Sequence, residues 1–389
     1  MFAEYSGRPG GGGKPLPRVA LLRLEPVRGA VVPAPAVPEP VELRVSIREE
    51  GAPLAWSRTV SLPASRAERM LQLADQLQRW ARGDGLTAGA AASLSRQLGR
   101  DLFRSFLGTV GAHTLDAMAP TALLIQVDET LVNLPWELLW RPSGPMSLQI
   151  PVGRVVTSSS APLARRDPVS EDPTLRILAV ANPTQNLPAT EAEIEAIRGL
   201  AGSYGSVTVT VTVLERDGAT VEAFRSAVEG QDFDLLHFAG HASFDSGDPR
   251  ASALLLADGR LRADQVARLP WSAPPYVVFN SACESARAVA GDRLFTRRGR
   301  VNGLAAAFLS AGVEAYLGHY WPVGDSSARR FAEMFYTTLF SERSIGAAVF
   351  AARRQGAPDY FDGSDLTALG AVYFGDPGGA RVDVTAMAS

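Results

Sequence analysis

The stretch DLLHFAGHA, residues 234–242, and the stretch YVVFNSACES, residues 276–285, decide the fold of this chain. Each begins with an apolar run of the kind that a strand buried on both faces requires. Gly240 allows a sharp turn after the first strand, so His241 follows directly at its carboxyl end. Cys283 follows the second strand in the same way. Functional groups in parallel sheets lie at the carboxyl ends of the strands, and we expect His241 and Cys283 to share that edge.

Outward from these two stretches, apolar strand-like runs alternate with helical ones. The predicted strands are residues 122–127, 175–180, 207–214, 233–239, 276–280 and 314–319, and the predicted helices are residues 189–200, 220–229, 302–311, 326–339 and 345–355. This alternation predicts an α/β fold, in which a mostly parallel sheet carries helices on both faces.

The N-terminal part of the chain has a different pattern. Short β-type runs lie at residues 19–24, 41–47 and 56–62, and the strict alternation in the second run is typical of a half-exposed antiparallel sheet. Helical stretches follow at residues 65–82 and 88–107. We therefore expect a small N-terminal β-rich region, preceded by a disordered leader.

Composition excludes several classes of function. The 389 residues carry a net charge of -3 and include one cysteine. There is no basic cluster to bind nucleic acid directly, and one cysteine cannot form an internal disulfide or a Cys-rich metal site. No run of about 18 apolar residues predicts a membrane span, and the Gly-rich N-terminus has no signal-peptide core. We expect a cytoplasmic protein with no nucleic-acid or membrane contact.

Cys283 and His241 together indicate nucleophilic catalysis. The thiolate is the nucleophilic form of cysteine, and a histidine at a neighbouring strand end can accept the thiol proton. The spacing of the two residues is close to the roughly 50 residues that separate the pair in caspases. A single cysteine or histidine is usually structural, but two of them directly after apolar strands favour a catalytic pair.

His237 and His241 also form an H-x-x-x-H pattern, which raises the possibility of a zinc site. The glutamate of H-E-x-x-H is missing, and the segment is predicted to be a strand, so the two rings would not share a helical face. We therefore expect no metal and no cofactor. His237 is expected to pack within the sheet or to support His241.

Six motifs in this chain resemble those of CHAT peptidases, a caspase-like protease family. HFAGHA (residues 237–242) and NSACES (residues 280–285) are similar to the family's two catalytic motifs. LPWELL (134–139), GLAAAFLSAG (303–312), WPVGD (321–325) and YFGDP (373–377) match the family in the same order. The resemblance covers about residues 85–380 and implies a caspase-like fold.

The resemblance also implies a mechanism and a biological setting. His241 would activate Cys283, which attacks a peptide carbonyl and forms a thioester. The backbone N–H groups of Cys283 and Ala242 would form the oxyanion hole. Glycine is common in the family at the position of Ala242, and alanine would be strained there if φ were positive. Family members act largely in bacterial antiviral defence, are switched on by a sensor partner, and in some cases cleave a gasdermin or another protein effector.

Two further site predictions follow from the family motifs. Trp321 and Asp325 would form the wall of the substrate pocket, where a carboxylate favours Arg or Lys before the cut bond. Asp325 could equally cap the helix that follows it. The loop containing Arg297, Arg298 and Arg300 would be a self-processing site, although a solvated loop has the same composition.

The family resemblance predicts a division of the chain. We expect a disordered leader at residues 1–17, the β-rich region with one helix at residues 18–84, and the CHAT peptidase domain at residues 85–389. Within that domain, residues 85–170 would be its N-terminal portion and residues 171–380 the catalytic α/β sheet.

Two other functions remain open for this sequence. The chain could be a catalytically silent caspase-like scaffold that binds a regulatory partner, or a cysteine-dependent acyltransferase that uses the same pair of residues.

Overall fold

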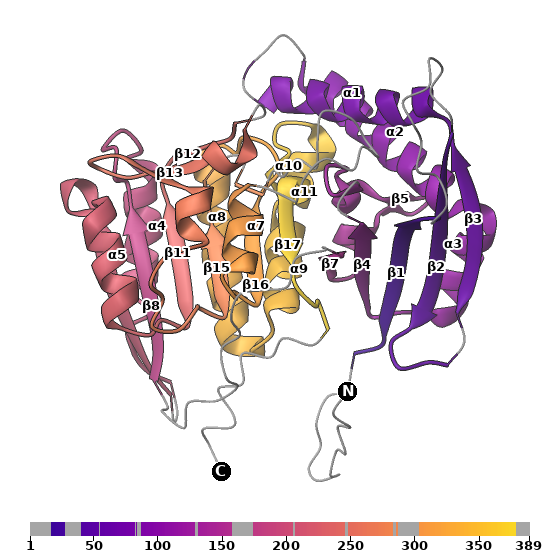
Figure 1. Ribbon diagram of the computed structural model, residues 1–389. Helices are drawn as coiled ribbons and strands as arrows, with labels where there is room; N and C mark the ends of the chain where they lie inside the picture. The colour runs from indigo at the N-terminus through magenta and orange to yellow at the C-terminus, as the bar shows by residue number, and fades with distance from the viewer. Residues whose placement is uncertain are drawn as a thin grey trace.

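One twelve-stranded sheet runs through the described part of the chain (Figure 1). The computed structural model describes residues 17–27, 40–53, 55–81, 83, 87–128, 131–157, 174–204, 207–245, 248–282, 285–286 and 303–378. In spatial order the strands are β3 (Trp56–Leu62), β2 (Val41–Glu49), β1 (Val19–Pro26), β4 (Ala122–Asp128), β7 (Val152–Thr157), β17 (Ala371–Phe374), β16 (Ala315–His319), β15 (Val277–Asn280), β11 (Leu235–Ala239), β8 (Thr174–Ala181), β10 (Val207–Glu215) and β9 (Gly202–Tyr204). Most neighbouring pairs are parallel, which confirms the predicted α/β class.

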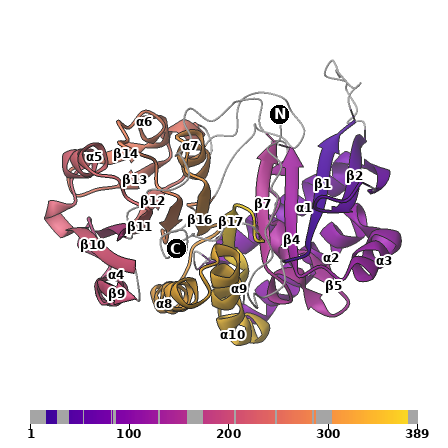
Figure 2. The same cartoon turned by 90° about the horizontal axis from the view of Figure 1, so that it is seen from below.

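Helices cover both faces of the half-sheet that runs from β17 to β9. Figure 2 shows α5 (Val221–Gly230), α6 (Ala263–Val266) and α7 (Leu304–Ser310) on one side, and α4 (Ala189–Arg198), α8 (Asp325–Glu342) and α9 (Ile345–Gln355) on the other. Two apolar clusters separate these helices from the strands, one on each face. The strands are consequently buried on both sides, which explains their continuous apolar sequences.

The N-terminal strands extend the same sheet. β3, β2 and β1 are antiparallel, as the alternation predicts, with Leu43, Val45 and Ile47 of β2 buried and Arg44 and Arg48 exposed. The parallel pairing of β1 with β4 was not evident from the sequence. Its consequence is that the N-terminal region and the α/β region share one sheet.

Three helices cover the buried face of this N-terminal half-sheet: α1 (Ala64–Ala81), α2 (Ala88–Phe106) and α3 (Gly108–Met118). Thr87 begins α2 by accepting a hydrogen bond from the backbone N–H of Ala90, the usual role of an N-cap threonine. Gly99 lies where α2 crosses the carbonyl of Leu138, and a Cβ at this position would lie 2.1 Å from that oxygen. Within the described ranges, no helix is both long enough and apolar enough to cross a membrane.

The remaining elements are short. They are the helices α10 (Ala357–Asp362) and α11 (Thr367–Gly370), the 3-10 helices η2 (Trp136–Leu138), η3 (Met146–Leu148), η4 (Arg216–Gly218) and η5 (Pro249–Ala251), the three-stranded sheet β12 (Ala242–Ser243), β13 (Ala253–Leu255) and β14 (Arg260–Arg262), and the pair β5 (Trp140–Arg141) and β6 (Gly144–Pro145).

The two half-sheets meet at a narrow seam between β7 and β17. The ladder here has a single register pair, Arg154 with Phe374, next to a hydrogen bond from the N–H of Gly375 to the carbonyl of Arg154. Arg353 of α9 reinforces the seam. Its guanidinium donates to the carbonyl of Val152, the first residue of β7, and to the carbonyl of Ala371, the first residue of β17, at 2.9 Å each. One arginine therefore holds both strands.

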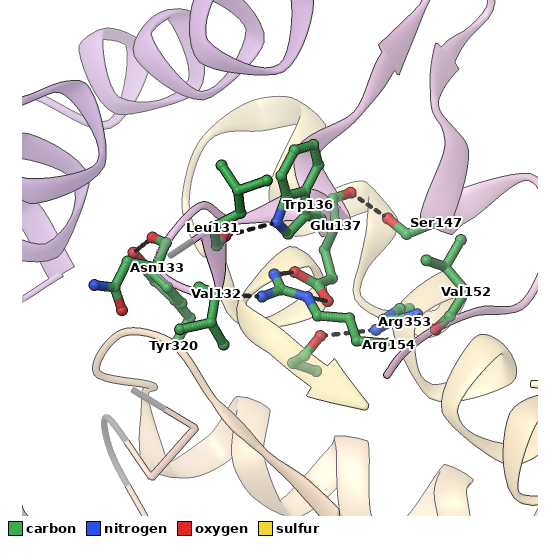
Figure 3. Close-up of polar contacts among 11 residues, drawn as sticks. Leu131, Val132, Asn133, Trp136, Glu137, Ser147, Val152, Arg154, Tyr320 and Arg353 are labelled. Carbon is green, nitrogen blue, oxygen red and sulfur yellow. Dashed lines mark hydrogen bonds and ion pairs between the residues drawn. The ribbon is translucent and has the colours of Figure 1, made fainter. Parts of the chain in front are cut away.

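A buried ion pair lies beside this seam (Figure 3). The guanidinium of Arg154 donates from both Nε and Nη2 to the carboxylate of Glu137, and from Nη1 to the carbonyl of Val132. Glu137, Arg154 and Arg353 are all fully buried. Burial lowers the pKa of Arg353 to about 10, with Arg154 adding to the shift and Glu137 opposing it. The single carboxylate therefore offsets part of the charge of two buried guanidinium groups.

Replacing Arg154 by Met should strongly destabilise the fold. The carboxylate of Glu137 would lose its bidentate partner in a site that water cannot reach, and breaking a buried ion pair on one side costs about 3–5 kcal/mol. Urea denaturation followed by tryptophan fluorescence measures this loss. The double variant Glu137→Leu with Arg154→Met is the control, because it removes both charges and should lose less stability. Equal losses of stability in the single and double variants would show that an unpaired Glu137 carboxylate is not the cause of the destabilisation.

A second prediction concerns the crossing of α2 over Leu138. Gly99→Ala should lower the free energy of unfolding by about 1–3 kcal/mol, because the added methyl group meets backbone that cannot move freely. Gly89→Ala in the same helix is the matched control, since a Cβ there has no atom within 4 Å and alanine favours helix by up to about 1 kcal/mol. If both variants have the wild-type midpoint in thermal unfolding, the crossing is looser than this contact implies.

Candidate active site

His241 lies directly beyond the carboxyl end of β11. All five residues of β11 are buried, and Gly240 then allows the chain to pass close to the ring of Phe238 and to Pro183. A Cβ on Gly240 would lie 2.9 Å from the Phe238 ring and 3.1 Å from Pro183, so only glycine fits without displacement. The carbonyl of His241 accepts a hydrogen bond from the N–H of Leu255 on β13. The half-exposed imidazole is therefore carried on a backbone fixed from both sides.

The segment that contains Cys283 begins at the next strand. Phe238 of β11 and Asn280 of β15 are register partners in the parallel ladder, and the N–H of Ser281 donates to the carbonyl of Phe238. His241 and Cys283 each come three residues after this pair in the sequence. Cys283 itself lies outside the described residues.

The residues after Cys283 are anchored to β16. The hydroxyl of Ser285 donates to the carbonyl of Asn280 and accepts from the N–H of His319, and the carbonyl of Ser285 accepts from the hydroxyl of Tyr316. The N–H of Ala286 donates to the carbonyl of His319. Gly318 makes room for this turn, since a Cβ there would lie 2.7 Å from the Ser285 hydroxyl. The chain on either side of the cysteine is thus bonded to neighbouring strands.

A third loop reaches His241 from the end of β8. The Nε2 atom of His241 lies 3.0 Å from Oδ1 of Asn186. The sequence-based prediction did not include Asn186. The signal was available, because Asn186 follows the apolar strand at residues 175–180 and so belongs to the loop at the same carboxyl edge.

His237 points away from this loop, into the sheet. Its Nε2 lies 2.9 Å from Oε1 of Glu193 on α4, and its Nδ1 lies 2.9 Å from the hydroxyl of Tyr336 on α8. All three side chains are buried, and burial raises the pKa of Tyr336 well above its usual value. The hydrogen bond to Tyr336 ties α8 to β11, and Nε2 of His237 faces the carboxylate of Glu193 on α4.

Residues 96–360 of the chain match the model of the CHAT domain family. This chain belongs to the CHAT domain family. The matched range includes His241, Asn186 and the anchored residues on both sides of Cys283. No curated protein matches this chain.

The chain is similar to solved structures of separase and RgpB. Separase of Saccharomyces cerevisiae, in its complex with securin, gives a TM-score of 0.59 at 11% identity, covering 92% of this chain and 30% of the separase chain. A second structure of that complex gives 0.56 at the same identity and coverage. RgpB of Porphyromonas gingivalis, as a complex of pro- and mature domains, gives 0.47 at 16% identity, covering 82% of this chain and 78% of that one. This chain thus has a separase-like fold and spans 30% of the length of the separase chain.

The other predicted site residues of the CHAT domain lie in different environments. Trp321 is fully buried and its indole N–H donates to the carbonyl of Leu366, so it has no surface for a substrate in this conformation. Asp325 is exposed in the first turn of α8, after the N-cap Gly324. A carboxylate at this position interacts favourably with the helix dipole. Ala242 begins β12 without a positive φ, so alanine is not strained there. Arg297, Arg298 and Arg300 lie outside the described residues.

His319 is a buried histidine at the end of β16. Its side chain is fully buried beside Phe279 and Phe331, and neither ring nitrogen has a hydrogen-bond partner among the described residues. Desolvation lowers its pKa to about 4, although the charges of Glu193 and Asp365 act in the opposite direction. The ring is therefore neutral at pH 7.

His319 should make the CHAT fold sensitive to acid. The unfolded state, with a histidine pKa near 6.5, binds a proton more readily than the native state between pH 6.5 and pH 4. Stability should therefore fall across this range, with His319 accounting for a loss on the order of 3 kcal/mol. Denaturant unfolding at pH 7 and pH 4.5 should show a smaller acid loss for His319→Phe than for wild type. His113→Gln, which changes an exposed histidine, should behave as wild type. An unchanged acid loss in His319→Phe would contradict this prediction.

Proposed function

We propose that this chain is a cysteine endopeptidase in which His241 activates Cys283. The observation that carries the proposal is the pairing of the two strand ends. His241 follows β11, the cysteine segment follows β15, and the register pair Phe238 and Asn280 brings these ends side by side. The bonds of Ser281 and Ser285 to the neighbouring strands support the proposal, because they fix the backbone on either side of the proposed nucleophile.

The proposed reaction has two steps. The thiol proton passes to His241, and the thiolate of Cys283 attacks the substrate carbonyl to give a tetrahedral oxyanion. The C–N bond then breaks, the amine leaves with the proton from His241, and a thioester remains on Cys283. Water, deprotonated by His241, hydrolyses the thioester and releases the acid. The backbone N–H groups of Ala242 and Cys283 are the proposed donors to the oxyanion.

The proposed substrate is a protein, and the proposed regulator is a second protein. The family resemblance supports a role in bacterial defence, in which a sensor partner switches the peptidase on and a gasdermin-like effector is cut. The similar separase structures were solved with securin bound, which supports a protein partner as the means of control.

The proposed specificity is for a basic residue before the cut bond. Asp325 is the candidate carboxylate, and its exposed place at the start of α8 leaves it accessible to a substrate side chain. Trp321, the other residue proposed for this pocket, is buried and bonds to the carbonyl of Leu366. Basic specificity would also make Arg297, Arg298 and Arg300 a self-processing site.

Cleavage of a positional-scanning peptide library tests the function directly. Wild type should cut peptides after Arg or Lys, and both Cys283→Ala and His241→Ala should reduce the rate at least 100-fold, because general base catalysis contributes about 10²–10⁴-fold. His113→Gln is the matched histidine control and should keep full activity. Asp325→Asn should lose the basic preference. Mass spectrometry of the wild-type chain in the same reaction reports self-cleavage.

The scaffold alternative predicts a different set of results. A silent caspase-like protein would cut no peptide, even with its partner present, and a covalent electrophile would label Cys283 equally in wild type and His241→Ala. The acyltransferase alternative predicts exchange of the acyl group onto an added amine in place of hydrolysis to the free acid. Either set of results would contradict the endopeptidase proposal and support the corresponding alternative.

A further inference from the structure

We infer that Asn186 orients the imidazole of His241, and that Nδ1 of His241 is the nitrogen that accepts the thiol proton. This inference rests on the proposed catalytic role of His241. It starts from the 3.0 Å contact between Nε2 of His241 and Oδ1 of Asn186. An amide oxygen can only accept a hydrogen bond, so the protonation of the ring follows from which atom of Asn186 faces it.

Thr184 makes a second contact to the same amide oxygen. Its hydroxyl donates to Oδ1 of Asn186 at 2.6 Å. The same oxygen then accepts a second hydrogen bond from Nε2–H of His241. A neutral imidazole carries one N–H, so placing the proton on Nε2 leaves the lone pair on Nδ1. The acceptor for the thiol proton is therefore Nδ1.

The loop that carries Asn186 is fixed at its beginning and at its end. The N–H of Asn182 donates to the carbonyl of Ala239, the last residue of β11, and Oδ1 of Asn182 accepts from the N–H of Leu187. Asn182 is buried and left-handed, with φ of 44°, and Gln185 is also left-handed, with φ of 57°. Such backbone is costly for residues other than glycine and persists where the surroundings hold it. The loop is thus built around one defined position of Asn186.

Two further contacts join this loop to the His241 segment. Pro183 packs against Gly240, the residue directly before His241, and a Cβ on Gly240 would lie 3.1 Å from Pro183, closer than an ordinary contact. Beyond the loop, the carboxylate of Glu193 on α4 lies 2.9 Å from Nε2 of His237 on β11. The loop and the helix after it are therefore attached to the strand that carries the histidine.

The orientation has a chemical consequence. When the thiol proton moves to Nδ1, the ring becomes an imidazolium with two N–H groups, and Oδ1 of Asn186 continues to accept from Nε2–H. A hydrogen bond to a charged donor is stronger than one to a neutral donor, so the contact favours the thiolate–imidazolium pair over the neutral pair. Asn186 is a positioning residue, since it acts through His241 and not on the substrate.

The test is the pH profile of Cys283 alkylation by iodoacetamide, which needs no peptide substrate. A free thiol with a pKa of about 8.5 reacts slowly at pH 6, so fast reaction at pH 6 reports a thiolate formed with the help of His241. Asn186→Ala should slow alkylation at pH 6 about tenfold or more, toward the rate of His241→Ala. At pH 9.5 the thiol ionises without help, so the alkylation rate of Asn186→Ala should stay within about twofold of the wild-type rate.

Two matched variants separate positioning from general disturbance of the loop. Asn186→Asp keeps an oxygen acceptor at the same atom and should retain the wild-type rate at pH 6. Gln185→Asn changes the exposed neighbouring side chain to a residue that tolerates left-handed backbone, and it should also match wild type. In the peptide library, Asn186→Ala should lower kcat about 10- to 100-fold with little change in KM.

The outcomes distinguish this inference from the proposed function. Equal profiles for wild type and Asn186→Ala would overturn the positioning role, even if peptides are cut. A shifted profile for Asn186→Ala in a chain that cuts no peptide would retain the positioning role and overturn the endopeptidase. Wild type with no advantage over His241→Ala at pH 6 would overturn both.

Discussion

The seam between β7 and β17 depends on one buried carboxylate, that of Glu137, and on the two arginines beside it. Arg154 is bound to Glu137 on both oxygens, and Arg353 bonds to the first residues of both strands. A single register pair would otherwise join the two half-sheets. The site depends on this seam indirectly, because β17 pairs with β16, and the end of β16 holds the turn after Cys283. Buried ion pairs often contribute little net stability, and here the geometry indicates a role in specifying which strands meet.

Close packing of loops at the carboxyl edge builds the site. Gly240 allows the loop at Asn186 to approach His241, and Gly318 allows the turn at Ser285 to lie on β16. The space that a Cβ would need is occupied by the Phe238 ring and Pro183 at Gly240, and by the Ser285 hydroxyl and the Tyr316 ring at Gly318. The site is thus formed by three loops that hydrogen-bond to one another's strands. Such an arrangement fixes the backbone that carries His241 and Asn186, as the proposed nucleophilic catalysis requires.

The four histidines of the chain show how environment divides one residue type into different roles. His241 is half-exposed and lies 3.0 Å from the amide oxygen of Asn186, whereas His237 is buried between the hydroxyl of Tyr336 and the carboxylate of Glu193. His319 is buried without a hydrogen-bond partner in the described part of the chain, and its lowered pKa keeps it uncharged. His113 is exposed on α3. Membership of the CHAT family is consistent with the proposal that His241 is the catalytic histidine.

The sequence by itself determined the α/β class, the positions of most strands and helices, and the placement of His241 directly after a buried strand. These features follow from local periodicity: β11, β15 and β16 are short, mostly apolar runs, and α9 was predicted at residues 345–355, where it lies. Only the tertiary structure decided that β1 joins β4, that Arg353 holds the seam, that Trp321 is buried, and that Asn186 meets His241. Each of these depends on contacts between residues far apart in the chain, and neither periodicity nor residue type encodes which distant partner a side chain will reach.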